Sequence, residues 1–455
     1  MKLGFIGRRS EMETLEREFA RGSSFVLITG RRRVGKTRLI GEFIAGKDAI
    51  YYLATQQTER LAMSDFSALL SRRIGRTYGE FRDWRDALSA FAESGMRILV
   101  LDEFQYLCRD PAFASLLQES WDAVLSKKDI MLIVCGSHMT TMESLGDRDS
   151  PLYGRFTRRM VVQPLPFRDV SEGRDFRQAV EEYSVLGGVP RYMELFDDVP
   201  LRENVLRNVM DPTSPMHRDP EVLLGGEVAN PVSYMSIMKA VAAGNRRISD
   251  ISSAVEVPST TINAYLQKLI DIRMLRRDVP VTDNDPSRSR NGLYSIEDLY
   301  TSFWFRFVYP YASDLEMGHP EWAMSEFDSH FIERHVSFVF ERICRESVWD
   351  LAKEIGFRPV RVGGYWDRIS EIDVMAIDPD GKRAFAAECK YRSNRPVDYH
   401  VLNELRAKCA SVKKLEGYEI IYGLFSVSGF DDRLMGEPGI LLVDCGKVVR
   451  RPSDP

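Results

Sequence analysis

The hydrophobic residues in the first third of the chain form short runs that are separated by helical segments. Apolar runs at 25–28, 49–53, 98–101, 130–135 and 160–162 predict strands, and the spacing at 14–19 and 81–93 predicts helices between them. Strands that alternate with helices are typical of a parallel α/β sheet, which binds its ligand at the carboxyl ends of the strands.

The pattern changes to mainly helical from residue 233 to 275. Within 260–270, Ile262, Leu266 and Leu269 share one helix face, and strand-like runs follow at 274–279 and 292–296. Two helices joined by a tight turn, followed by a hairpin, predict a winged helix-turn-helix. Its polar residues would contact duplex DNA (Ser259, Thr260, Thr261, Asn263, Lys268, Arg288 and Arg290). Packing inside the protein is an equal alternative, because the helix carries only one cation.

A further pair of strands is predicted at 371–378 and 383–391, joined by a turn at 378–381. Strand alternation places Glu388 and Lys390 on one face, and the hairpin brings Asp373 beside them. Two carboxylates and an ammonium on one sheet predict a site for a divalent cation that acts on phosphodiesters. A structural ion pair between Asp373 and Lys390 is the alternative.

The loop after the first strand carries the clearest chemical signal. It reads Gly-Arg-Arg-Arg-Val-Gly-Lys-Thr from Gly30 to Thr37 and leads into a helix. A Gly-x-x-x-x-Gly-Lys-Thr loop between a strand and a helix predicts a P-loop, whose amides surround phosphate groups. Lys36 would then reach the β- and γ-phosphates, and the Thr37 hydroxyl would bind Mg²⁺. The expected nucleotide-binding segment is completed by Arg31, Arg32, Arg33, Val34, Gly35 and Arg38.

Acidic residues end the strand at 98–101. Asp102 and Glu103 follow Leu101 directly, which in a chain with an upstream P-loop predicts a Walker B pair. Asp102 would hold Mg²⁺ through water, and Glu103 would polarise the attacking water. Ser137, which follows the strand at 130–135, would lie beside the γ-phosphate, although a serine there is equally compatible with a simple turn.

Composition narrows the class of protein. The chain has 455 residues, 44% of them hydrophobic and 28% charged, with a formal net charge of −5. These values suit a globular protein of several domains, and any basic surface must be local. The six cysteines lack metal-site spacing and favour reduced packing residues. No apolar run is long enough to span a membrane and no signal-peptide pattern opens the chain, so a cytoplasmic location without membrane partners is expected.

Several segments resemble the archaeal-type ATPase family, which is related to AAA and STAND ATPases. They are the box Gly7-Arg8-Arg9-Ser10-Glu11, the segment Ser150-Pro151-Leu152-Tyr153-Gly154-Arg155, and Leu186-Gly187-Gly188-Val189-Pro190-Arg191-Tyr192. The aromatic run at 302–310 is similar to a segment of the same family. The resemblance implies that Arg155 contacts the nucleotide as an arginine finger or sensor. A surface salt bridge is the alternative role for Arg155.

The C-terminal hairpin resembles the PD-(D/E)xK nuclease superfamily, with Asp373, Glu388 and Lys390 in the motif positions. Isoleucine precedes Asp373 where the motif has proline. Glu341, on a predicted upstream helix, matches the additional acid on the metal side. The resemblance implies a Mg²⁺ or Mn²⁺ site formed by Glu341, Asp373 and Glu388. It also agrees with the nuclease-like C-terminal domain of archaeal-type ATPases.

We therefore predict an α/β P-loop ATPase core at 1–170, a helical lid at 171–230, a winged helix at 231–312 and an α/β restriction-endonuclease-like domain at 313–455. The expected function is a Mg²⁺-dependent ATPase that switches between ATP and ADP states, and oligomers would suit this class. It would control an appended module that binds DNA and cleaves it with metal. The alternatives are an ATP-binding DNA regulator with an inactive nuclease fold, and a protein-remodelling machine.

Overall fold

The computed structural model describes residues 4–391 and 395–444, which divide into two compact units. The first unit comprises residues 1–165, 189–195 and 223–229, and the second comprises 166–188, 196–222 and 230–455. The chain therefore passes between the units several times. The finer division into four domains stays a prediction. Cys445 lies outside the described residues, and the other five cysteines are free thiols.

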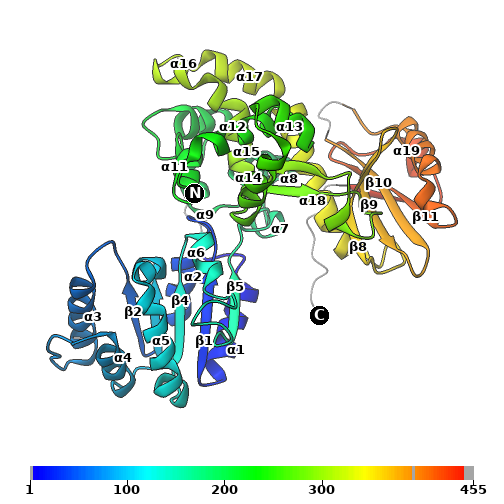
Figure 1. Ribbon diagram of the computed structural model, residues 1–455. Helices are drawn as coiled ribbons and strands as arrows, with labels where there is room; N and C mark the ends of the chain where they lie inside the picture. Colours follow the sequence, from blue (N-terminus) through cyan, green and yellow to red (C-terminus); the bar gives the residue numbers. More distant parts are fainter. Residues whose placement is uncertain (1–3, 392–394, 445–455) are drawn as a thin grey trace. The chain divides into compact units, whose positions relative to one another are not determined.

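A five-stranded parallel sheet forms the centre of the first unit, in the order β2-β3-β4-β1-β5 (Figure 1). This confirms the predicted parallel α/β sheet. Its strands are β1 (Ser24–Thr29), β2 (Ala49–Leu53), β3 (Ile98–Asp102), β4 (Met131–Cys135) and β5 (Arg158–Val161). The helices of this unit are α1 (Arg9–Ala20), α2 (Lys36–Ile44), α3 (Glu59–Ile74), α4 (Trp84–Glu93), α5 (Pro111–Ala123), α6 (Met139–Ser144) and α9 (Pro190–Leu195).

Two hydrophobic clusters cover the two faces of this sheet. Phe25 and Leu27 belong to one cluster, whereas Val26 and Ile28 belong to the other. Successive side chains of a strand point to opposite faces, so a strand covered on both sides is apolar at every position. This double coverage explains why the strands appear in the sequence as continuous apolar runs.

The second unit begins with helices and ends with a mixed sheet, in the order β12-β11-β10-β9-β8. The pairs β8–β9 and β9–β10 are antiparallel, and β10–β11 and β11–β12 are parallel. These strands are β8 (Arg361–Trp366), β9 (Glu371–Asp378), β10 (Arg383–Lys390), β11 (Glu419–Ser426) and β12 (Ile440–Asp444). The predicted separate C-terminal sheet is thus confirmed. Helix α19 (Tyr399–Ser411) packs Leu402 and Leu405 into its core.

Helices form most of the remainder of the second unit. They are α7 (Phe167–Val170), α8 (Phe176–Leu186), α10 (Leu201–Val205), α12 (Pro231–Ala242), α13 (Ile248–Val255), α14 (Ser259–Asp271), α15 (Leu299–Phe307), α16 (Ala312–Glu316), α17 (Glu321–Phe331), α18 (Ser337–Ser347) and α20 (Asp432–Met435). Helix α11 (Asp219–Gly225) spans a boundary between the units. An antiparallel hairpin of β6 (Leu275–Asp278) and β7 (Leu293–Ile296) follows α14. No helix among the described residues is sufficiently long and apolar to cross a membrane.

Candidate functional site

The loop from Gly30 to Gly35 joins β1 to α2, as the sequence predicts. Gly30 has a φ of 149°, and a Cβ there would lie 2.5 Å from the carbonyl oxygen of Val162. Gly35 has a φ of 95° and is the N-cap residue of α2. Both positions therefore favour glycine, because side chains rarely adopt this backbone conformation and the first lacks space for one. The resulting bend directs the start of α2 toward the loop.

Lys36 is buried beneath this loop. Its Nζ donates hydrogen bonds to the carbonyl oxygens of Gly30 at 2.7 Å and Arg31 at 2.9 Å. Burial lowers the pKa of this ammonium below its ordinary value. The side chain is thus held at the loop by two neutral acceptors rather than by a carboxylate. An anionic ligand at the loop would provide the compensating charge.

Asp102 joins the loop helix to the neighbouring strands. It is 1% exposed, and its Oδ2 accepts hydrogen bonds from Thr37 Oγ1 at 3.0 Å and from the Tyr51 hydroxyl. Its Oδ1 accepts from the Glu103 amide at 2.8 Å. A hydroxyl and a carboxylate at this distance form a hard oxygen donor set, which fits Mg²⁺. Sequence reasoning missed Tyr51, whose only signal is that it lies in the adjacent strand.

Glu103 lies immediately after β3 in a left-handed backbone conformation, with a φ of 52°. Ser137 Oγ donates to its Oε2 at 3.1 Å, and Gln105 Nε2 donates to the same oxygen. Non-glycine residues in this conformation are uncommon, and such strained positions cluster at functional sites. The predicted Glu103 and Ser137 are therefore brought together, and Gln105 is an additional contact that the sequence analysis did not include.

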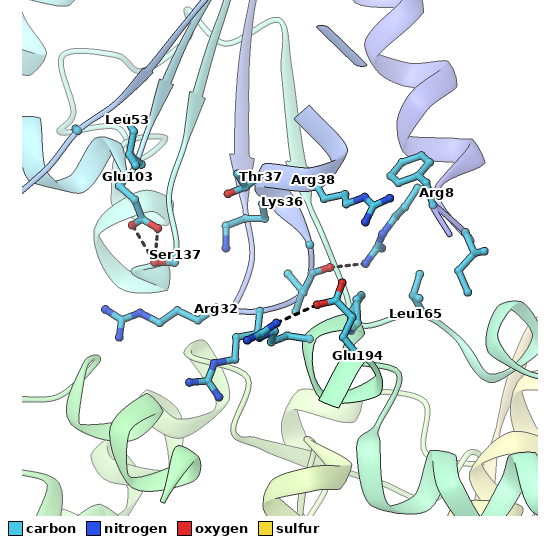
Figure 2. A pocket seen from close by; sticks show the side chains of 18 of the residues that line it. Arg8, Arg32, Lys36, Thr37, Arg38, Leu53, Glu103, Ser137, Leu165 and Glu194 are labelled. Atoms are coloured by element: carbon cyan, nitrogen blue, oxygen red, sulfur yellow. Dashed lines mark hydrogen bonds and ion pairs between the residues drawn. The ribbon is translucent and has the colours of Figure 1, made fainter. Parts of the chain in front are cut away.

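These residues line a pocket of about 910 Å³ in the first unit. Figure 2 shows Lys36, Thr37, Glu103 and Ser137 around it, with Arg8, Arg32 and Arg38 nearby. Arg33, Val34 and Gly35 also lie in its wall, and α9 contributes Pro190, Arg191 and Glu194. The volume is within the range of small-molecule sites. The wall does not include Gly30 and Arg31, which shape the loop, or Asp102, which lies beneath it.

Two arginines outside the loop, Arg8 and Arg155, have different surroundings. Arg8 is 5% exposed, lines the pocket, and donates to the carbonyl oxygens of Val34 at 2.8 Å and Gln163 at 2.7 Å, so it fixes the P-loop to the segment after β5. Arg155 instead donates to Asp122 at 2.8 Å and to the Pro151 carbonyl at 2.9 Å, and it does not line the pocket. The contact with Asp122 is the surface salt bridge that was the alternative for Arg155, and its nucleotide role stays a prediction.

The C-terminal sheet brings the second predicted group of residues together. Lys390 Nζ donates to Glu388 Oε2 at 2.8 Å and lies 3.9 Å from Asp373 Oδ2. Asp373 accepts the Cys389 amide at 2.8 Å, just beyond the last paired residues of β9 and β10. Lys408 from α19 donates to Glu388 Oε1 at 2.8 Å. Lys408 was not predicted, because it comes from a helix about twenty residues downstream.

The third acid, Glu341, lies on α18. Its Oε2 accepts from Arg345 Nη2 at 3.1 Å, and Arg345 Nε donates to the Asp373 carbonyl oxygen at 2.6 Å. Burial, reinforced by the Asp373 charge, raises the pKa of Glu341 to about 8. Burial, reinforced by Glu388, raises the pKa of Asp373 to about 6. The acids are thus close enough to repel one another, as the predicted cluster requires.

The donor set of this cluster suits a divalent cation less well than the P-loop site does. Both carboxylate oxygens of Glu388 already accept from lysines. Within residues 4–391 and 395–444, no group of three or more His, Cys, Asp or Glu side chains has the spacing of a metal site. The Mg²⁺ or Mn²⁺ site formed by Glu341, Asp373 and Glu388 therefore stays a prediction.

The predicted helix-turn-helix residues lie on α14. Ile262, Leu266 and Leu269 are buried, and Ser259, Thr260, Thr261 and Asn263 are exposed. The loop at 283–291 contacts the C-terminal sheet, since Arg361 donates to the Asp283 carbonyl at 2.5 Å and Trp366 Nε1 donates to the Asn291 carbonyl at 2.9 Å. Arg288 is exposed and pairs with Asp285 at 3.4 Å. These contacts favour internal packing of the loop, and DNA contact stays a prediction.

The first part of the chain matches a known protein family. Residues 5–196 match the family model described as an ATPase domain predominantly from Archaea. These residues belong to the archaeal ATPase family. The loop at 30–37 and the acids Asp102 and Glu103 lie within the matched residues. Residues 304–402 match a second family, described as archaeal and bacterial proteins of unknown function.

Three other proteins are similar to this chain over most of their own length. An uncharacterized protein of Methanocaldococcus jannaschii is 27% identical over 428 residues, covering 92% of this chain and 95% of its own. The Walker-type ATPase of Pyrococcus abyssi is 21% identical, with a TM-score of 0.48, covering 66% of this chain and 95% of its own. The ORC2 protein of Aeropyrum pernix, solved in ADPNP–ADP complexes, is 14% identical, with a TM-score of 0.45, covering 68% and 94%.

Proposed function

We propose that the chain binds ATP with Mg²⁺ in the P-loop pocket and hydrolyses it. The observation that carries this function is the 3.0 Å hydrogen bond between Thr37 and the buried Asp102, next to a loop whose two glycines, Gly30 and Gly35, have positive φ values. In P-loop enzymes this pair of residues holds the magnesium ion. The charge on Lys36, whose ammonium donates its hydrogen bonds to carbonyl oxygens, supports the binding of a triphosphate at the same place.

Each residue has a distinct role in this function. The loop amides and Lys36 bind the β- and γ-phosphates, and Thr37 with Asp102 would hold Mg²⁺, which neutralises phosphate charge when bound. Glu103 orients and deprotonates the attacking water, and Ser137 positions Glu103 through their 3.1 Å contact. Arg32 and Arg33 in the pocket wall add positive potential toward the phosphates.

Helix α9 offers a route by which the nucleotide state reaches the second unit. Pro190, Arg191 and Glu194 of α9 line the pocket, and the chain enters the second unit on both sides of this helix. Gly187 and Gly188 precede it with φ values of 62° and 67°. A change in the position of α9 on ATP binding would therefore be transmitted through short covalent connections, as in other switch proteins.

The second unit would be the effector that this switch controls. We propose that it binds DNA and that Asp373, Glu388 and Lys390 cleave it with Mg²⁺ or Mn²⁺. The clustering of these residues with Glu341 on one sheet supports this activity, since two of the carboxylates have raised pKa values that a cation would relieve. The lysine pair on Glu388 supports the second candidate, an ATP-dependent DNA regulator with an inactive nuclease fold.

ATP binding is tested with Lys36→Ala in the full chain, with calorimetric titration of ATP and Mg²⁺. Loss of tight binding is expected, because this buried ammonium is held at the loop by the carbonyl oxygens of Gly30 and Arg31. Lys47→Ala is the matched control, since Lys47 lies just after α2 and contacts Glu16 and the Phe43 carbonyl. Unchanged affinity in Lys36→Ala would exclude this pocket as the triphosphate site.

Cleavage is tested with a plasmid assay that combines nucleotide (none, ATP or a slowly hydrolysed analogue) with Mg²⁺ or Mn²⁺. Metal-dependent nicking that disappears in Lys390→Ala and persists in the control Lys382→Ala supports the nuclease. Lys382 lies in the turn between β9 and β10, away from the acids. Absence of nicking under every combination, together with retained DNA binding, supports the inactive fold.

A further inference from the structure

A second cavity, of about 590 Å³, lies within the C-terminal unit. It is lined by the hairpin β6–β7, by α15 and α18, and by the facing parts of β8 and β9. All of these elements belong to the same compact unit. The cavity shares no lining residue with the P-loop pocket, and its volume is that of a small-molecule site.

Arginine is the dominant charged residue of this cavity. Three of its arginines pair with carboxylates in the wall: Arg276 with Asp278 at 3.1 Å, Arg342 with Glu346 at 3.2 Å, and Arg345 with Glu341 at 3.1 Å. Three more arginines complete the wall, namely Arg246, Arg277 and Arg306. The wall thus has six arginines and only four acids, the fourth being Glu371.

Two of the additional arginines are held by neutral groups. Arg277 donates to the carbonyl oxygens of Pro286 at 2.8 Å and Ser289 at 2.5 Å, and Arg306 Nη2 donates to the Ala242 carbonyl at 3.5 Å. Carbonyl oxygens fix a guanidinium without cancelling its charge. Burial also lowers the pKa of Arg276, and the positive charges of Arg342 and Arg345 act in the same direction. The cavity therefore has an excess of converging positive charge, which an anion would relieve.

The wall of this cavity also contains aromatic side chains. Trp349 and Phe338 line the cavity and are 50% and 55% exposed, although both are large and apolar. Trp366 also lines it, with its indole fixed by the 2.9 Å bond to the Asn291 carbonyl. Exposed aromatic rings beside guanidinium groups are suited to a ligand that has both a planar ring and a phosphate.

We propose that this cavity binds a phosphorylated nucleoside, with the phosphate among the arginines and the base against the tryptophans. The nucleoside has two sources with the same chemistry: a free nucleotide, or the 5′-phosphorylated end of a nucleic-acid strand. This site is distinct from the P-loop pocket, because the two share no lining residue.

The test uses the full chain carrying Lys36→Ala, and measures fluorescence anisotropy at low salt with three labelled probes. They are a nucleoside 5′-monophosphate, a short single strand with a 5′-phosphate, and the same strand with a 5′-hydroxyl. Saturable binding of the monophosphate indicates the free nucleotide. Tighter binding of the phosphorylated strand than of the hydroxyl strand indicates the strand end. Equal binding of the two strands, with none of the monophosphate, overturns the site.

Substitutions in the cavity wall test whether the probe binds there. Arg246→Gln and Arg276→Gln should each weaken the bound probe by about tenfold or more, because a hydrogen bond to a charged phosphate is lost. Arg247→Gln is the matched control, since this neighbouring arginine is exposed and does not line the cavity. Thermal melts check that the variants fold, and Arg246 makes no ion pair among the described residues. Equal affinity in Arg246→Gln and Arg247→Gln would overturn the assignment.

Discussion

Glu103→Gln separates ATP binding from ATP hydrolysis. Glutamine has the same shape as glutamate, and its amide oxygen can still accept from Ser137 and Gln105, which now contact the carboxylate. The left-handed backbone at this position, with a φ of 52°, is retained because the peptide is unchanged. The substitution therefore removes the ability to take a proton from water and leaves the pocket wall in place.

The expected effect on hydrolysis is large. A positioned general base contributes about 10²–10⁴-fold to the rate, so the activation free energy should rise by about 3–5 kcal/mol. The affinity for Mg²⁺–ATP should change by less than about threefold, since Glu103 does not contact Lys36 or Thr37 through a hydrogen bond. Phosphate release at saturating Mg²⁺–ATP gives the rate, and calorimetric titration gives the affinity.

Glu194→Gln is the matched control for this experiment. Glu194 lies in the same pocket and loses the same charge, but it pairs with Arg191 at 3.2 Å on α9. Its rate of hydrolysis should remain within about twofold of the unmodified chain. Hydrolysis at the unmodified rate in Glu103→Gln would refute the role of Glu103 as base. An equal loss in both variants would show that the charge of the pocket, not proton transfer, controls the rate.

Three further predictions concern the structure around the two sites. Gly30→Ala should destabilise the first unit by about 1–3 kcal/mol and weaken ATP binding, because the added Cβ would lie 2.5 Å from the Val162 carbonyl oxygen. Gly41→Ala is the control, since a Cβ there would have no atom within 4 Å. Denaturant melts of the two variants measure the difference in the free energy of unfolding. Tyr51→Phe should cost about 1.5–3 kcal/mol in the same melts, because the buried Asp102 loses a donor, and an unchanged midpoint would contradict that hydrogen bond. Burial lowers the pKa of His335 to about 3, so on acidification the unfolded chain takes up a proton at this residue before the folded chain does. The free energy of unfolding should therefore fall by about 2 kcal/mol from pH 7 to pH 5. In a chain with His335→Phe, this fall should be smaller by the same amount.

The sequence alone determined the elements and motifs that depend on near neighbours. The strand 98–102, the P-loop after β1 and the buried face of α14 follow from apolar spacing and from glycines at fixed positions. Such patterns are set by the period of the backbone and by local conformation, so a single stretch of chain contains the information. The hairpin of β9 and β10, which places Glu388 and Lys390 on one face, is determined in the same way.

The tertiary structure decided which side chains complete each site. Tyr51 meets Asp102, and Lys408 meets Glu388, across separations of 51 and 20 residues. Arg155 pairs with Asp122 although its motif implied a nucleotide contact. Contacts of this kind depend on the register and packing of elements that are distant in the chain, because each side chain settles on whichever partner the assembled fold places within hydrogen-bonding distance. Local spacing contains no information about that distance.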